Sequence, residues 1–166
     1  MSVAVASAGW SVVTPDAEGT AAIGAVLGRA APDGALILLE GPLGAGKTTF
    51  AQGVGVGCGV RDPVTSPTYN LILHYVGDRR FTHIDLYRLE DAAQLDTLGL
   101  EEVLGGSGVT CVEWPELLGE SPAPPWARVR ISPAGPGGER LLRGVLGGEG
   151  WETALAMLVE RGARPE

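Results

Sequence analysis

The sequence predicts a three-layer α/β fold around a mixed, mainly parallel central sheet, completed by a C-terminal β-hairpin and helix. Two local patterns lead to this prediction. Residues 35–39 are short, uniformly apolar and bounded by turn residues, which is typical of a strand buried on both faces of a parallel sheet. Residues 41–48 match G-x-x-x-x-G-K-[ST], and a helical stretch follows from Phe50 toward Cys58. Strand, glycine loop and helix in this order predict a P-loop NTPase-like fold.

The size and composition fit one globular domain that spans residues 1–166. Hydrophobic residues make up 45% of the chain and charged residues 19%, so it can bury a core without disulfides or a structural metal. The 12 Lys and Arg residues are outnumbered by 20 Asp and Glu, which gives a formal net charge of −8. Because cations supply the affinity for a phosphate backbone, this balance argues against direct nucleic-acid binding over a broad face.

Apolar runs, the N-terminal segment and the cysteines indicate the cellular compartment in which we expect the protein. The longest aliphatic run, residues 35–39, is far shorter than the roughly 20 residues of a membrane-spanning helix. The N-terminal segment has neither a basic region nor a sustained apolar run, which argues against a signal peptide. Cys58 and Cys111 are isolated and expected to be reduced and buried, and His74 and His83 are not spaced as metal ligands. We therefore expect a cytoplasmic protein.

Helix and turn signals order the remaining elements. Thr14-Pro15-Asp16 places a hydroxyl at the N-cap of a first helix, which continues at helical spacing until Pro32-Asp33-Gly34. Beyond the P-loop helix, the pattern predicts a hairpin of residues 70–76 and 81–85, helices at 86–99 and 100–104, a core strand at 109–112, a hairpin of 127–132 and 140–146, and a closing helix at 151–161.

The glycine loop forms the predicted nucleotide site. Its glycines let successive backbone N–H groups turn toward phosphate oxygens, and the start of the following helix adds partial positive charge. Lys47, the single lysine of the chain, is expected to reach the β- and γ-phosphates, and the Thr48 hydroxyl is expected to ligate Mg²⁺. The expected nucleotide contacts in the loop are Gly41, Leu43, Gly44, Ala45, Gly46, Lys47, Thr48 and Thr49.

Two acids at strand ends complete the predicted catalytic set with Lys47. Glu113 follows the more apolar strand and is the expected metal-side carboxylate, whereas Asp85 is expected to orient the attacking water or the metal shell. Which of the two is the direct ligand stays open at this point. Ser66 and Thr68 flank a proline between the P-loop helix and the next strand, where they can sense the γ-phosphate. His83 is interpreted as a residue that packs against the sheet.

The P-loop does not by itself fix the reaction. Ras-like GTPases recognise guanine through Asn-Lys-x-Asp, which is impossible here because the one lysine lies in the P-loop. Small-molecule and nucleotide kinases usually close an arginine-rich lid over the phosphates. Here the clustered arginines, Arg79, Arg80 and Arg88, lie in a hairpin and after a strand rather than in a lid insertion. An ATP hydrolase is favoured, with a kinase and a non-hydrolysing ATP-binding adaptor as alternatives.

Short blocks along the middle of the chain form a further pattern. They are Gly41 to Phe50, Ser66-Pro67-Thr68-Tyr69, His83 to Leu89, Leu98-Gly99-Leu100 and Val112 to Glu116. In order and spacing these blocks resemble the bacterial TsaE family, the small P-loop ATPases of tRNA threonylcarbamoyladenosine biosynthesis. They cover about residues 36–118, half of the chain, and are together far more specific than the P-loop alone.

The resemblance implies a Mg²⁺-dependent, weak ATPase that acts with the TsaD and TsaB proteins. Threonylcarbamoyl is then transferred to N6 of adenosine 37 in tRNAs that read ANN codons, and this chain meets the tRNA only indirectly, through the complex. The family's functional positions correspond to Lys47, Thr48, Asp85 and Glu113. The resemblance also gives the Ser66–Tyr69 loop a switch-like role and makes Trp114 a site-shaping aromatic. Neither the stoichiometry, the adenine contacts nor the step driven by hydrolysis follows from it.

Overall fold

The computed structural model describes residues 7–67, 71–104, 106–119, 123 and 125–166. Its elements in chain order are β1 (Ser7–Thr14), α1 (Ala17–Ala30), β2 (Ala35–Glu40), α2 (Lys47–Gly57), β3 (Ile72–Val76), β4 (Arg80–Asp85), α3 (Ala93–Asp96), α4 (Leu100–Leu104), β5 (Val109–Glu113), the 3₁₀ helix η1 (Pro115–Leu118), β6 (Trp126–Pro133), β7 (Arg140–Gly147), α5 (Glu152–Glu160) and β8 (Arg164–Pro165). Within these ranges, no helix has both the length and the apolar character needed to cross a membrane.

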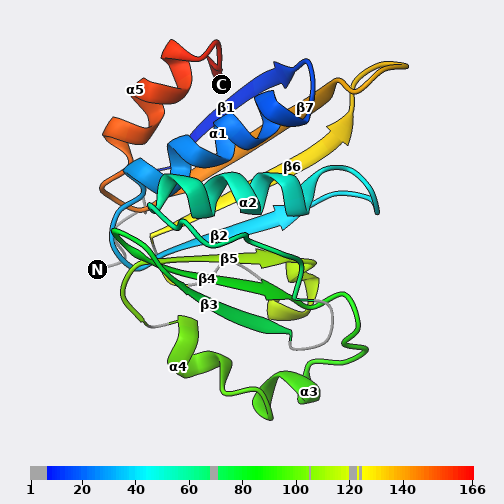
Figure 1. Ribbon diagram of the computed structural model, residues 1–166, viewed down its shortest axis with the longest axis vertical. Helices are drawn as coiled ribbons and strands as arrows, with labels where there is room; N and C mark the ends of the chain where they lie inside the picture. Colours follow the sequence, from blue (N-terminus) through cyan, green and yellow to red (C-terminus); the bar gives the residue numbers. More distant parts are fainter. Residues whose placement is uncertain (1–6, 68–70, 105, 120–122, 124) are drawn as a thin grey trace.

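The described strands form a single sheet in the order β3-β4-β5-β2-β6-β7-β1-β8 (Figure 1). The central strands β4, β5, β2 and β6 pair in parallel. The four other pairings are antiparallel. The prediction of a mixed sheet is thus confirmed, but the prediction that it is mainly parallel is wrong. Hairpin strands extend both ends of the sheet, and β1, which the sequence analysis did not anticipate, pairs antiparallel with β7 and β8.

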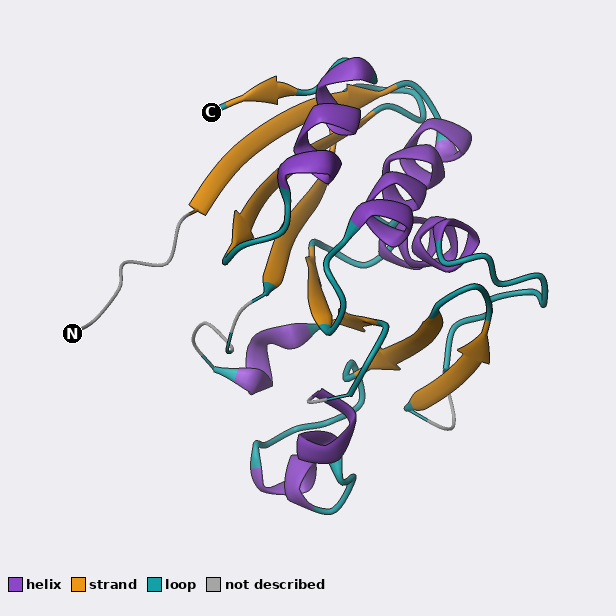
Figure 2. Ribbon diagram, turned by 90° about the vertical axis from the view of Figure 1, so that its left-hand side faces the viewer, coloured by secondary structure: helices purple, strands orange, loops and turns teal. Residues whose placement is uncertain are grey.

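Alternate side chains of β2 belong to two separate hydrophobic cores, one on each face of the sheet. Ala35, Ile37 and Leu39 belong to the cluster under α1, α2 and α5, whereas Leu36 and Leu38 belong to the cluster formed with α4 and η1. Figure 2 shows helices on both sides of the sheet, as the α/β class requires. Because both faces of β2 are covered, its carboxyl end is held firmly, and the glycine loop starts from that end.

Most of the remaining predicted elements are present. The two hairpins, the core strand that ends at Glu113, the short helix from Leu100 and the closing helix are confirmed within two residues at their ends, and residue 70, the predicted start of the first hairpin, lies outside the described residues. The start of the first helix is corrected: Thr14 ends β1, and the N-cap is Asp16, whose side chain accepts a hydrogen bond from the Gly19 N–H at 2.8 Å. An aspartate N-cap satisfies an otherwise unpaired helix N–H as a threonine would.

The predicted helix over residues 86–99 is wrong for most of its length. Only Ala93–Asp96 is helical. The Gln94 side chain accepts the Glu90 and Asp91 N–H groups at 2.7 and 3.3 Å, while the Asp91 carboxylate accepts the Gln94 N–H at 3.2 Å. Asp91 and Gln94 thus form a capping box, which marks a helix start near Asp91 and excludes one at Leu86.

Helices α1 and α2 pack at backbone contact. Gly24 and Gly28 of α1 face Phe50 and Val54 of α2, and an added Cβ at Gly28 would lie 2.0 Å from the Val54 carbonyl oxygen. The arrangement is reciprocal, because an added Cβ at Gly53 of α2 would lie 2.0 Å from the Ala21 carbonyl oxygen. Each helix therefore fits into the space that its partner's glycines leave, which fixes the position of α2 against α1.

Both thiols are buried and free, as predicted. Burial raises the pKa of Cys58 from its ordinary value of 9.0 to about 11, against a lowering by Arg79, and burial also raises the pKa of Cys111. We expect neither thiol of the folded protein to react with a disulfide reagent at pH 8, and both to react in urea. Stability should fall as the pH rises from about 9 toward 11, because only the unfolded thiol then releases its proton. A thiol that reacts rapidly in the folded protein would contradict this assignment.

Candidate functional site

The glycine loop leaves β2 at Gly41 and enters α2 at Lys47. Gly41, Gly44 and Gly46 have φ values of 149°, 78° and 111°, which side chains with a Cβ rarely adopt. At Gly41 an added Cβ would also lie 2.3 Å from the Ile131 carbonyl oxygen on β6. Gly46 is the N-cap of α2 and contributes no side-chain cap. The first N–H groups of α2 are therefore left without a capping side chain, and the positive end of the helix is presented at the loop.

Lys47 folds back across the loop. Its ammonium donates to the Gly41 and Pro42 carbonyl oxygens at 2.6 and 2.8 Å and lies 4.0 Å from the centre of the Trp114 ring. The side chain is only 4% exposed. Burial lowers the pKa of Lys47, although the nearby Glu113, Glu116 and Asp85 carboxylates oppose that shift. The prediction that Trp114 shapes the site thus agrees with its contact to the lysine.

Thr48 and Glu113 meet across the carboxyl ends of β2 and β5. The Thr48 hydroxyl lies 2.9 and 3.2 Å from the two Glu113 carboxylate oxygens, although the residues are 65 positions apart. Parallel pairing of Leu39 with Glu113 brings them together, because it ends β5 level with the start of the glycine loop. Glu113 is 3% exposed, so its carboxylate lies inside the site rather than on a solvated surface.

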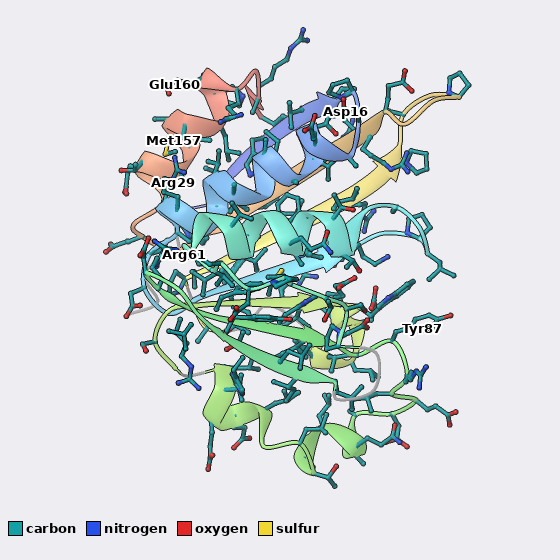
Figure 3. The ribbon with its side chains drawn as sticks, in the orientation of Figure 1. Asp16, Arg29, Arg61, Tyr87, Met157 and Glu160 are labelled. Atoms are coloured by element: carbon teal, nitrogen blue, oxygen red, sulfur yellow. The ribbon has the colours of Figure 1, made fainter. Side chains whose placement is uncertain are left out.

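Asp85 joins this group from β4. It pairs in register with Glu113, accepts the Tyr87 N–H at 2.9 Å and contacts the Ser66 hydroxyl at 3.4 Å. Burial raises the pKa of Asp85; the Tyr87 N–H opposes the shift and the Glu113 charge adds to it. Figure 3 shows Tyr87 beyond the end of β4, on the side of the sheet where the glycine loop lies. The predicted Ser66 is thus part of the site, whereas Thr68 lies outside the described residues.

These side chains surround one cavity of about 380 Å³. It is lined by Leu43, Gly44, Gly46, Lys47, Thr48, Thr49, Ser66, Asp85, Tyr87, Glu113 and Trp114. Of the predicted loop contacts, Gly41 and Ala45 shape the loop without lining this cavity: Gly41 takes the sharp turn and Ala45 is buried. The sequence therefore identified most of the polar lining, but not Tyr87.

The oxygen donors of the cavity fit a hard divalent cation. Thr48 offers a hydroxyl and Glu113 and Asp85 offer carboxylates, and Mg²⁺ typically binds one or two carboxylates together with water and substrate phosphates. The described residues contain no cluster of three or more His, Cys, Asp and Glu side chains that could hold a metal alone. The set therefore suits a cation that shares its coordination with a phosphate ligand.

Sequence reasoning missed the role of His83 in this site. The ring is fully buried, as expected of a residue packed on the sheet, but its Nε2 atom lies 2.6 Å from the Glu113 carboxylate. A signal was present, since His83 and Asp85 are two residues apart on one strand and so lie on the same face.

Arg140 of β7 approaches the loop from the other side. Its Nε donates to the Ala45 carbonyl oxygen at 2.7 Å, and a terminal nitrogen lies 3.5 Å from the Gly44 carbonyl oxygen. Arg140 thus contacts the glycine loop through its backbone carbonyl groups. Beside it, a second cavity of about 180 Å³ opens between the start of α1 and the loop.

Comparison with known proteins places this site in a family. A family model described as "Threonylcarbamoyl adenosine biosynthesis protein TsaE" matches residues 14–140. The chain belongs to the TsaE family. The matched region includes the glycine loop, Asp85, Glu113 and Arg140, so the whole cavity lies within the part of the chain that defines TsaE proteins.

Individual TsaE relatives agree with the family model. The chain is 43% identical to the tRNA threonylcarbamoyladenosine biosynthesis protein TsaE of Bacillus subtilis over 112 residues, which are 67% of this chain and 68% of that protein. It is 38% identical to the Treponema pallidum TsaE over 106 residues, 64% of this chain and 78% of that protein. The crystal structure of Bacillus subtilis YdiB superposes with a TM-score of 0.73 at 32% identity, covering 96% of this chain and 98% of the other.

Proposed function

We propose that the chain is a Mg²⁺-dependent ATPase with weak intrinsic turnover, which acts in the threonylcarbamoylation of tRNA. The observation that carries the proposal is the contact between Thr48 and Glu113, beside Lys47, at the end of a strand–glycine loop–helix unit. A hydroxyl bound to an acidic carboxylate next to a phosphate loop is the arrangement that P-loop NTPases use to hold Mg²⁺. Membership of a tRNA-modification family supplies the pathway.

Each side chain has a task in this proposal. The loop N–H groups and the Lys47 ammonium bind the phosphates of ATP, and Thr48 and Glu113 hold the cation. Bound Mg²⁺ would neutralise charge that develops on the phosphate oxygens. Asp85 lies opposite Glu113 and orients the attacking water; the burial that raises its pKa makes its carboxylate a better proton acceptor. Ser66 ties the switch-like loop to Asp85.

Weak intrinsic turnover follows from the state of Arg140. An arginine that stabilises the transferred phosphoryl group accelerates P-loop hydrolysis strongly. Arg140 reaches the loop, but its Nε atom is bound to the Ala45 carbonyl oxygen. We therefore propose that TsaD and TsaB complete the site, and that the tRNA is held by that complex in the cytoplasm. The net charge of −8 supports an indirect contact with the tRNA.

Two assays test this function together. Purified protein should release phosphate slowly from ATP with Mg²⁺ and not with EDTA, and TsaB with TsaD should raise the rate. A reconstituted tRNA threonylcarbamoylation reaction should complete multiple turnovers only when the chain is present. Unchanged modification on its omission would contradict the proposed role. Transfer of labelled phosphate to an acceptor instead of water would indicate a kinase, and nucleotide-dependent partner binding without phosphate release would indicate an adaptor.

A further inference from the structure

His83 is a fully buried imidazole that the proposed reaction does not use. It lies on β4, stacks on Phe81 with ring centres 6.2 Å apart, and bonds through Nε2 to the Glu113 carboxylate at 2.6 Å. Glu113 is itself 3% exposed, so the bond is shielded from solvent. A hydrogen bond in such low-dielectric surroundings is stronger than an exposed one.

Hydrogen-bonding capacity assigns the tautomer of this ring. A carboxylate that ligates a cation is ionised and can only accept, so in the cation-binding state the proton of this bond belongs to His83 Nε2. The other nitrogen, Nδ1, is buried and has no hydrogen-bond partner among the residues that the structure describes. A proton on Nδ1 would leave a buried N–H without an acceptor there, which is unfavourable. The Nε2–H tautomer, with a bare Nδ1, is therefore favoured.

The Glu113 carboxylate is held from two elements at once. His83 on β4 donates to Oε2 at 2.6 Å, and Thr48 on α2 lies 2.9 Å from Oε1 and 3.2 Å from Oε2. The bond from His83 restricts rotation of the carboxylate and keeps Oε1 directed at the Thr48 hydroxyl. Without this bond, the Glu113 carboxylate would keep, among the described residues, only its contact with Thr48, whose oxygen is also needed as the proposed cation ligand.

We propose that His83 is a positioning residue, which uses its Nε2–H to fix the Glu113 carboxylate for cation binding. The proposal rests on the proposed function in so far as the cation is Mg²⁺ bound with ATP. Residues that orient a metal ligand through a hydrogen bond typically change metal affinity or activity by about 10- to 100-fold when they are replaced. His83 acts through Glu113 and is not itself among the residues that line the cavity.

A spectroscopic experiment tests the bond without nucleotide. The chain has only two histidines, so the ¹⁵N-labelled rings of His83 and His74 are readily told apart by a His74→Gln variant. The His83 ring should show the Nε2–H tautomer, with a proton resonance shifted far downfield by the short bond. Glu113→Gln should move that resonance upfield and leave His74, which bonds to Thr82 on the β3–β4 hairpin, unchanged. A His83 resonance indifferent to Glu113→Gln would overturn the proposal.

A matched pair of substitutions tests the function of the bond. The amide nitrogen of His83→Gln can occupy the position of Nε2 and donate, whereas His83→Leu fills the space without a donor. In a Mg²⁺ titration of ATP binding, His83→Leu should raise the half-maximal Mg²⁺ concentration about 10- to 100-fold, and His83→Gln should remain within about threefold of wild type. Affinity for nucleotide in EDTA should be the same in all three proteins, and His74→Gln serves as the control.

The possible results distinguish a failure of the positioning role of His83 from a failure of the proposed ATPase function. Equal Mg²⁺ dependence in the Leu and Gln variants would overturn the positioning role, as would a parallel loss of nucleotide affinity in EDTA. If the Leu variant does not fold, the Gln variant and the Glu113→Gln resonance still decide the question. If wild type binds no Mg-ATP, the proposed ATPase function fails, while the resonance experiment continues to report on the bond itself.

Discussion

Replacing Lys47 with alanine is expected to lower phosphate release from Mg-ATP by about 100-fold or more, while the protein stays folded. Lys47 is the only lysine of the chain, and the other charged side chains that line its cavity are the acidic Asp85 and Glu113. Without the ammonium, phosphates would enter a cavity whose remaining side-chain charges repel them. Folding should change little, because the Gly41 and Pro42 carbonyl groups that lose their donor can bond to water.

Two control proteins isolate the charge at the loop. Lys47→Met keeps the length of the stem and should fail as Lys47→Ala does, which would show that the ammonium matters rather than the packing. Arg130→Ala removes the same charge from a side chain that is 72% exposed on β6, outside the cavity, and should keep full activity. Steady-state phosphate release and thermal unfolding are measured on all four proteins. Retention of half the activity by Lys47→Ala would refute the assigned site.

The single lysine also allows a direct readout of occupancy. An amine-reactive reagent has one side-chain target in this chain, and Mg-ATP should protect Lys47 from it. Burial lowers the pKa of Lys47, so its labelling should begin at a lower pH than that of an ordinary lysine. Labelling that is indifferent to Mg-ATP would count against the site.

Replacing Gly28 with alanine is expected to destabilise the fold by about 3 kcal/mol or more. Helix propensity favours this change by about 1 kcal/mol in an exposed helix. In the structure the new Cβ would lie 2.0 Å from the Val54 carbonyl oxygen, and only a shift of α1 away from α2 relieves that overlap. The free-energy cost of this overlap therefore exceeds the gain in helix propensity. Because α2 begins at the P-loop, such a shift should also weaken nucleotide binding in any protein that remains folded.

A second interface glycine and a glycine near the helix start complete this experiment. Gly53→Ala places its Cβ 2.0 Å from the Ala21 carbonyl oxygen and should be as damaging as Gly28→Ala. Gly19→Ala, in the first turn of α1, places its Cβ no closer than 3.0 Å to any other atom, so a shift of a few tenths of an ångström relieves the contact and the variant should stay within about 1 kcal/mol of wild type. Urea unfolding measures the free energy of unfolding of all three variants. Equal stability of Gly28→Ala and Gly19→Ala would show that the helices do not pack at backbone contact.

Local patterns accounted for much of the fold but failed in identifiable places. The strand at 35–39 and the strand ending at Glu113 were predictable because their apolar runs are continuous, as doubly covered strands require. The strand β1 went unnoticed because Ser, Ala and Gly interrupt its apolar alternation. The segment 86–99 has helix-forming residues, yet the reciprocal caps of Asp91 and Gln94 start its helix only near Asp91. Summed propensity does not locate such a start.

By itself, the sequence determined the backbone geometry of the glycine loop. Gly41 to Thr48 are consecutive, and glycines at fixed offsets give the backbone its turn, so the motif does not depend on distant contacts. It also identified Asp85 and Glu113 as acids that follow buried strands. Which face of the site each acid occupies could not be read from these local patterns.

Only the tertiary structure decided where the two carboxylates lie relative to Thr48 and His83. Parallel pairing sets Leu39 beside Glu113 and Glu113 beside Asp85, and this register brings Thr48 within 2.9 Å of a residue 65 positions away. The same pairing puts His83, 30 positions from Glu113, within hydrogen-bond distance of its carboxylate. Such contacts depend on strand order and register, which the whole core fixes through the packing of both sheet faces. The local sequence provides the groups, and the sheet sets their distances.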